Sequence, residues 1–167
     1  MTAERQRLWD FALGFYAASG VGEACLTLQD ECGVDVPVLL FSAWLSKHSV
    51  ALTEAELVRI DGVVADWRDE VVKPLRSVRR RLKSGPQPAP NHDTEALRNG
   101  LKGIELGSEK IEMAVLEAEG EALIAAGGAP VDAADNLALV LRHFHAAGPN
   151  PKTVEALAAI GEALAAF

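Results

Sequence analysis

The segment ACLTLQDECGVDVPVLLFSAWL, residues 24–45, decides the fold. Its first half completes a helix that we expect from Val21 to Cys32, because apolar side chains gather on one helical face there and Gly33 follows. Asp35 then has the side chain of a helix N-cap, and Pro37 falls in the first turn after it. The segment therefore predicts two helices joined by a tight turn.

The second of these helices, which we expect to end near Lys47, is apolar on almost every side. Its apolar residues are Val36, Val38, Leu39, Leu40, Phe41, Ala43, Trp44 and Leu45. A helix without a polar face is stable only when other elements cover it all round. We therefore expect this helix at the centre of the molecule.

The sequence around this segment predicts more helices and no strand. An apolar stripe predicts a helix over about 3–18, and Thr53 with Glu56 forms a capping box that begins another. Pro74 should kink that helix or begin a new one, and a proline-rich linker follows over 84–93. Further helices are expected over about 94–126, 130–145 and 152–166. We therefore expect an all-α fold, a single-domain bundle of six to seven helices.

Two of these helices carry apolar residues at alternating spacings of three and four, the pattern of a heptad seam. After Thr53 the seam is Leu57, Ile60, Val64, Trp67 and Val71. In the long helix over 94–126 it is Leu97, Leu101, Ile104, Ser108, Ile111, Val115, Ala118, Ala122 and Ala125. We expect the two helices to pack antiparallel across the linker. Whether the long seam pairs within the chain or with a second copy stays open.

Length and composition fit a globular protein of 167 residues, 49% of them apolar. The net charge of −8 disfavours wholesale nucleic-acid binding. No apolar run is long enough to span a membrane, and the N-terminus has no signal-peptide pattern, so we expect a cytoplasmic protein.

Cys25 and Cys32 are too far apart along one helix for a disulfide, and we expect both to be small buried groups.

Familiar catalytic and metal-binding motifs do not occur. The HExxH, CxxC, P-loop and GxSxG patterns are absent, and His143 and His145 fall on nearly opposite sides of their helix. We therefore assign no catalytic residue, no metal ligand and no cofactor, and we leave enzymatic activity undecided.

A basic segment has two interpretations. Arg76, Arg79, Arg80 and Lys83 share one helical face by their spacing. This face either docks an anionic partner or pairs within the molecule with the acidic long helix. That helix carries Glu105, Glu109, Glu112, Glu117, Glu119 and Glu121. Because no aromatic residues are interleaved with the basic ones, single-stranded nucleic acid is disfavoured as the partner.

Two further groups of residues are also open to two interpretations. The turn at Gly33 is surrounded by Gln29, Asp30, Glu31 and Asp35. Carboxylates at such a turn suit a metal ion or an acid–base pair. They also suit helix capping and surface salt bridges, so both interpretations stay open. A set of aromatic residues forms either core or the wall of a pocket for an apolar ligand. The set is Trp9, Phe11, Phe15, Tyr16, Phe41, Trp44 and Trp67.

Three groups of residues carry motifs in a fixed order. They are WDFA at 9–12 with Tyr16, then ACLxLQDxxGVDVxxLLFxxWL at 24–45, then WRxxVVxPLRxxRRxLK at 67–83. In order and spacing, over about residues 8–83, they resemble a family of uncharacterised proteobacterial proteins classed as a domain of unknown function. The resemblance implies a bacterial, cytoplasmic protein and supplies no catalytic residue, cofactor or partner. It divides the chain into a family-defining part (1–83), the linker (84–93) and a variable acidic part (94–167).

We expect a non-catalytic protein-interaction or regulatory module that uses the basic face or the long heptad helix, including by self-association. The alternative is a small-molecule binder or enzyme with an inter-helix pocket near Asp30, Asp35 and Arg76. Nucleic-acid binding through Arg79–Arg81 is a weaker third, and we expect no membrane partner. The candidate binding residues are Arg76, Arg79, Arg80, Lys83, Gln29, Asp30, Asp35, Trp67 and Arg68. We also predict that Asp30 or Asp35 pairs with Arg68 or Arg76.

Overall fold

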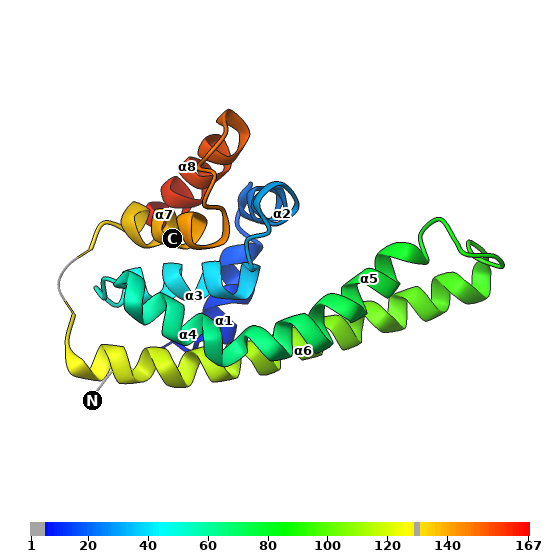
Figure 1. The fold of residues 1–167 in the computed structure, drawn as a ribbon, viewed down its shortest axis with the longest axis horizontal. Coiled ribbons are helices and arrows are strands. Elements are labelled where there is room, and N and C mark those ends of the chain that lie inside the picture. Colours follow the sequence, from blue (N-terminus) through cyan, green and yellow to red (C-terminus); the bar gives the residue numbers. More distant parts are fainter. Residues whose placement is uncertain (1–5, 129–130) are drawn as a thin grey trace.

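The computed structural model describes residues 6–128 and 131–167, and within these ranges every regular element is helical (Figure 1). The elements are α1 (Leu8–Tyr16), α2 (Val21–Cys32), α3 (Val36–Lys47), α4 (Glu54–Trp67), the π-helical η1 (Arg68–Val72), α5 (Lys73–Arg81), α6 (His92–Ala126), α7 (Ala133–Phe144) and α8 (Pro151–Ala166). Because α4, η1 and α5 follow one another without a break, the described residues form seven continuous helical stretches. The expected all-α bundle is confirmed.

The segment over 24–45 folds as its sequence predicts. α2 ends before Gly33, whose φ of 65° lies in the left-handed region that favours glycine. The Asp35 carboxylate then accepts a hydrogen bond from the Val38 N–H at 3.2 Å and caps α3. α3 packs against α1, α6 and α7 at the centre of the molecule, and Phe41 and Leu45 on it have no solvent exposure (Figure 1).

Several predicted helix ends are confirmed, and one helix is shorter than expected. Thr53 and Glu56 form the capping box of α4. α1 begins only at Leu8 and ends at Tyr16 rather than near residue 18, while residues 3–5 of its expected range lie outside the described residues. α7 covers Ala133–Phe144, and residue 130, where we expected it to begin, lies outside the described residues too.

Both cysteines are buried and form no disulfide, as expected. Burial raises the pKa of the Cys25 thiol to about 12, because the apolar surroundings disfavour a thiolate.

The seam of the α4 helix shifts by one residue at η1. Leu57, Ile60 and Val64 are buried as predicted, but the buried side chains after them are Arg68 and Val72 instead of Trp67 and Val71. A π-helical turn holds one residue more than an α-helical turn, so it moves every later side chain around the axis. Pro74 follows in the first turn of α5, where its missing N–H leaves a carbonyl of the preceding turn without its usual donor.

The heptad seam of α6, whose partner the sequence left open, does not pack against α4 or α5. α6 does run antiparallel to α4 and α5, but Ile104 and Ile111 on the predicted seam are 59% and 53% exposed (Figure 1). The face that α6 buries is centred instead on Glu105, Ser108, Glu112, Met113, Leu116, Glu117 and Gly120. The reason is that α5 presents arginines to α6, and these attract carboxylates rather than apolar side chains.

α5 and the first half of α6 extend away from the body as a two-helix arm, with the proline-rich turn at its tip (Figure 1). α1, α2 and α3 lie beside the base of this arm. The candidate site is formed where the arm meets these three helices.

Candidate functional site

A polar cleft of about 260 Å³ lies between the end of α2, the turn before α3, η1 and α5. Six of the nine predicted binding residues line it: Gln29, Asp30, Asp35, Arg68, Arg76 and Arg80. They come from positions up to 51 residues apart in the chain, Gln29 and Arg80, and the α2–α3 turn brings them together with η1 and α5. Trp67 and Lys83 line neither this cleft nor the apolar pocket described below.

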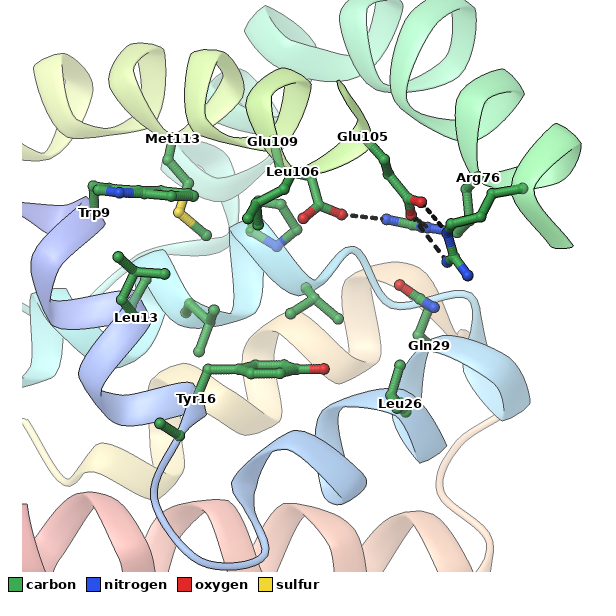
Figure 2. A pocket seen from close by; sticks show the side chains of 16 residues that line it. Trp9, Leu13, Tyr16, Leu26, Gln29, Arg76, Glu105, Leu106, Glu109 and Met113 are labelled. Carbon is green, nitrogen blue, oxygen red and sulfur yellow. Dashed lines mark hydrogen bonds and ion pairs between the residues drawn. The ribbon is translucent and has the colours of Figure 1, made fainter. Parts of the chain in front are cut away.

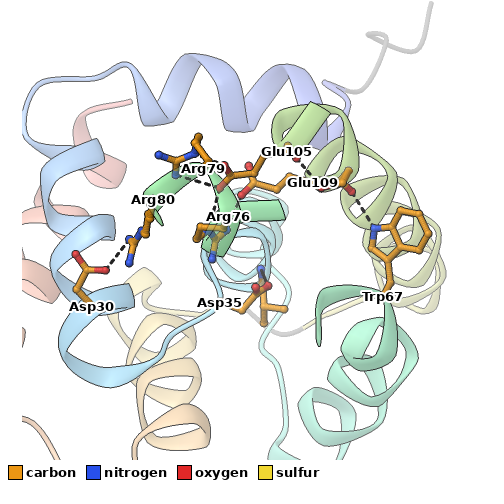
Figure 3. A network of polar contacts seen from close by, with 10 residues as sticks. Asp30, Asp35, Trp67, Arg76, Arg79, Arg80, Glu105 and Glu109 are labelled. Atoms are coloured by element: carbon orange, nitrogen blue, oxygen red, sulfur yellow. Dashed lines mark hydrogen bonds and ion pairs between the residues drawn. The ribbon is translucent and has the colours of Figure 1, made fainter. Parts of the chain in front are cut away.

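The arginines of α5 are paired with glutamates of α6 (Figure 3). Arg76 donates from Nε to Glu105 at 3.0 Å and from Nη2 to Glu109 at 2.7 Å, and Arg79 also donates to Glu105. Burial alone would raise the pKa of Glu105, but the hydrogen bonds from Arg79 and Arg76 outweigh it and lower that pKa. At Glu109 burial prevails over Arg76, and its pKa is raised. Most of the predicted basic face is thus turned toward the chain itself.

The predicted pairing of the acidic turn is wrong in its partners. Asp30 forms an ion pair with Arg80 at 2.9 Å, not with Arg68 or Arg76, and both side chains are about half exposed (Figure 3). Asp35 lies within the electrostatic reach of Arg68 and Arg76, but among the described residues it forms an ion pair with neither; it accepts from the Val38 N–H and lies against the Glu112 carboxyl. The π-helical segment turns Arg68 toward Asp61 of α4 instead, at 2.5 Å. The N-terminal helices are therefore tied to α5 by Arg80.

A buried cluster of charged side chains lies behind the cleft. Asp61 accepts from Arg68 with one oxygen and lies 2.8 Å from Nε2 of His143 with the other, so it links η1 to α7. Glu112 has no solvent exposure; its carboxyl lies against that of Asp35, and neither of its oxygens has another hydrogen-bond partner among the described residues. Burial, with the nearby Asp35 carboxylate adding to it, raises the pKa of Glu112 to about 9. Glu112 is therefore protonated at neutral pH.

A second, mainly apolar pocket of about 280 Å³ adjoins the polar cleft (Figure 2). Gln29 and Arg76 line both spaces, so they mark the boundary between them. The walls of the apolar pocket come from α1, α2, α3 and α6 and include Trp9, Leu13, Tyr16, Leu26, Leu40, Leu106 and Met113. Two residues of the aromatic set, Trp9 and Tyr16, thus line a pocket, while the others lie in the core or elsewhere.

Sequence reasoning missed the roles of Asp61 and His143. Neither belongs to a recognisable motif, and they come together only because η1 shifts Arg68 toward α4 and α7. Trp67, which we predicted as a binding residue, donates its indole N–H to the Ser108 carbonyl at 3.0 Å. It joins α4 to α6 in this way (Figure 3) and lines neither pocket.

Among the described residues, no group of three or more His, Cys, Asp or Glu side chains is placed to hold a metal ion. No single described helix is long and apolar enough to cross a membrane; α1 and α2 meet the length and composition only as a pair, across a bend of 99°.

The chain belongs to the family described as "Protein of unknown function (DUF2390)", whose match covers residues 7–116. This confirms the resemblance and extends it beyond residue 83, through the part of α6 that carries Glu105, Glu109 and Glu112. Every residue that lines the two pockets lies within the match, whereas His143 lies outside it. No curated protein and no solved structure matches the chain.

Proposed function

We propose that this protein is a non-catalytic interaction module whose partner is a second copy of the same chain, bound by the outer face of α6. One observation carries the proposal: an exposed stripe on α6 that alternates large apolar and small residues. The alternating stripe is Leu97, Gly100, Ile104, Gly107, Ile111 and Ala114, and Ala118 continues it with a further small residue. Its spacing alternates between three and four, so its members lie on one helical face.

The glycines of the stripe have no evident use within one chain. No described atom lies within 4 Å of where a Cβ would stand at Gly100 or Gly107, and neither has a positive φ. A glycine inside an exposed helix costs about 0.5–1 kcal/mol relative to alanine. Close approach of another helix is a physical reason for small residues at such positions, because a large side chain can then fill the space they leave.

The stripe is complementary to itself in an antiparallel arrangement. A two-fold axis that crosses it between Ile104 and Gly107 sets these two residues opposite each other. The same axis sets Gly100 opposite Ile111 and Leu97 opposite Ala114. Each large side chain then meets a small one, as an interface between identical copies requires.

The other surfaces considered from the sequence are less suited to this role. Arg76 and Arg79 are occupied by Glu105 and Glu109, and Arg80 is paired with Asp30. An anionic partner would have to compete with these carboxylates. This favours the outer face of α6 over the basic face, and it gives no support to nucleic acid as a partner.

Sedimentation equilibrium of the full chain at about 50 μM tests the proposal, with Gly100→Leu/Gly107→Leu as the variant. Leucine has a higher helix propensity than glycine, so the monomer should gain about 1–2 kcal/mol of stability. The leucines fill the spaces that the isoleucines need, so association should weaken by about tenfold or more. We expect the wild type to be a dimer and the variant a more stable monomer.

Gly62→Leu on α4 is the matched control, since Gly62 is exposed and also has open space around its Cβ position. It should dimerise as the wild type does. A wild type that is monomeric at this concentration, or a double variant that dimerises with unchanged affinity, contradicts the proposal.

A further inference from the structure

The charged side chains at the apolar pocket neutralise one another. Arg76 and Arg79 supply two positive charges at its polar end, and Glu105 and Glu109 supply two carboxylates that accept hydrogen bonds from them. A charged ligand group entering this end has to leave water and disturb pairs that are already formed. The pocket therefore offers little to a ligand with a net charge.

Two neutral polar groups at the same end are available to a ligand. Neither the Gln29 amide nor the Tyr16 hydroxyl takes part in a hydrogen bond described for the chain. The Tyr16 hydroxyl points toward the end of the pocket where Gln29 lies (Figure 2). Burial raises the pKa of Tyr16, so this hydroxyl stays protonated and can donate. Together the two side chains offer donors and an acceptor to a neutral group.

The rest of the pocket suits an apolar body of limited size. The ring of Trp9 and the side chains of Leu40 and Met113 form its walls. A volume of about 280 Å³ equals that of roughly nine water molecules in the liquid, enough for one ring with a short substituent. Leu13 and Leu26 at the edge are 48% and 45% exposed, so the pocket is open to solvent.

We propose that this pocket binds a small, uncharged amphipathic molecule, with a single ring or similar apolar body beside Trp9 and an amide-like head hydrogen-bonded to Gln29 and Tyr16. The site lies on the inner side of α6, opposite the stripe that we assign to self-association. It is therefore independent of that proposal, and the two are tested by different measurements.

Three probes with one apolar body test the charge of the head group. They are phenylacetamide (neutral), phenylacetate (anionic) and phenethylamine (cationic). Calorimetric titration of the full chain should give phenylacetamide a dissociation constant of about 1 mM or tighter. The two charged probes should bind about tenfold more weakly or worse. The amide should also change tryptophan fluorescence, and Trp9→Phe should remove that change.

Substitution of Gln29 provides a readout that loss of folding cannot imitate. Gln29→Leu should weaken phenylacetamide by about fivefold or more with an unchanged melting temperature. Gln29→Glu keeps the shape but adds a negative charge, so the order should reverse and phenethylamine should bind more tightly than the amide. Gln87→Glu in the exposed linker makes the same change of net charge far away and should keep the wild-type order.

Blocking the pocket gives the last arm of the test. Leu26→Trp places a larger side chain at the edge and should abolish binding of the amide, whereas Val63→Trp on the exposed surface of α4 should not. Binding of phenylacetate or phenethylamine as tight as that of the amide overturns the proposal. So does the absence of amide binding up to about 10 mM, or amide binding that Leu26→Trp leaves intact.

Discussion

Replacement of Glu112 by glutamine should remove much of the pH dependence of stability between about pH 6 and pH 8. The Glu112 carboxyl is fully buried, and its pKa is raised from the ordinary 4.5 to about 9. Burial is the main cause, and the neighbouring Asp35 carboxylate is the second. Arg68 opposes both, but does not cancel them.

The sign follows from linkage. Because the pKa is higher in the folded state than in the unfolded chain, the folded state holds this proton more tightly. The resulting stabilisation is complete below about pH 4.5 and is lost as pH rises toward 9. Each pH unit inside this window changes the free energy of unfolding by about 1.4 kcal/mol, so the wild type should lose about 2.7 kcal/mol from pH 6 to pH 8 through Glu112 alone. For a chain of this size that corresponds to a melting temperature about 5–11 °C lower.

Urea unfolding of the wild type and Glu112→Gln at both pH values measures this difference. Glutamine has nearly the shape of the protonated acid and can donate to Asp35 in the same way, so the variant should fold. Its stability should fall by about 2.7 kcal/mol less than that of the wild type over this range. Glu155→Gln on the exposed surface of α8 is the control and should follow the wild type. If Glu112→Gln loses as much stability as the wild type between the two pH values, Glu112 is already ionised in the folded protein and the reasoning is wrong.

Two predictions concern packing around α3. A Cβ at Gly120 would lie 2.6 Å from Trp44 and 2.7 Å from Phe41. Gly120→Ala should therefore lower the free energy of unfolding by about 1–3 kcal/mol, measured by urea unfolding. An unchanged urea midpoint would mean that α6 moves away from α3 freely. The Asn136 amide accepts from the Leu52 N–H at 2.9 Å and donates to the Val50 carbonyl at 2.9 Å. Asn136→Leu should therefore cost about 2–4 kcal/mol by leaving buried backbone groups unpaired, and a melting temperature equal to that of the wild type would contradict this.

The parts of the fold that could be predicted depend on local signals. The left-handed turn at Gly33, the Asp35 cap and the capping box at Thr53 are each determined by residues within one helical turn of one another. Their energies come from backbone conformation and short-range hydrogen bonds, which do not depend on what packs nearby. Sequence patterns of this kind therefore give helix ends that agree with the structure.

The candidate site could be predicted only in part, because its geometry depends on distant partners. A pocket near Asp30, Asp35 and Arg76 was one of the sequence-based alternatives, but the sequence did not indicate that Gln29, Arg68 and Arg80 line the same cleft. Pairing of the basic face with Glu105 and Glu109 was one of the two interpretations of the sequence. The partners of Asp30 and Arg68 were misassigned, since the π-helical turn that reorients Arg68 leaves no clear pattern in the sequence. The unusual environment of Glu112 likewise arises only when α6 is laid against the cap of α3.

The orientation of α6 reflects a competition between two of its faces, and the electrostatic one prevails. Ile104 and Ile111 are 59% and 53% exposed, so burying the rest of each side chain against α5 would gain about 1–2 kcal/mol apiece. It would also turn Glu105 away from Arg76, whose side chain is only 13% exposed, and an unpaired charge in such a place costs about 3–5 kcal/mol. Arg79 would lose the same partner, so pairing outweighs apolar burial on this side of the helix. The apolar stripe is left outside for that reason, and the pairing that places it there also neutralises the charged end of the pocket.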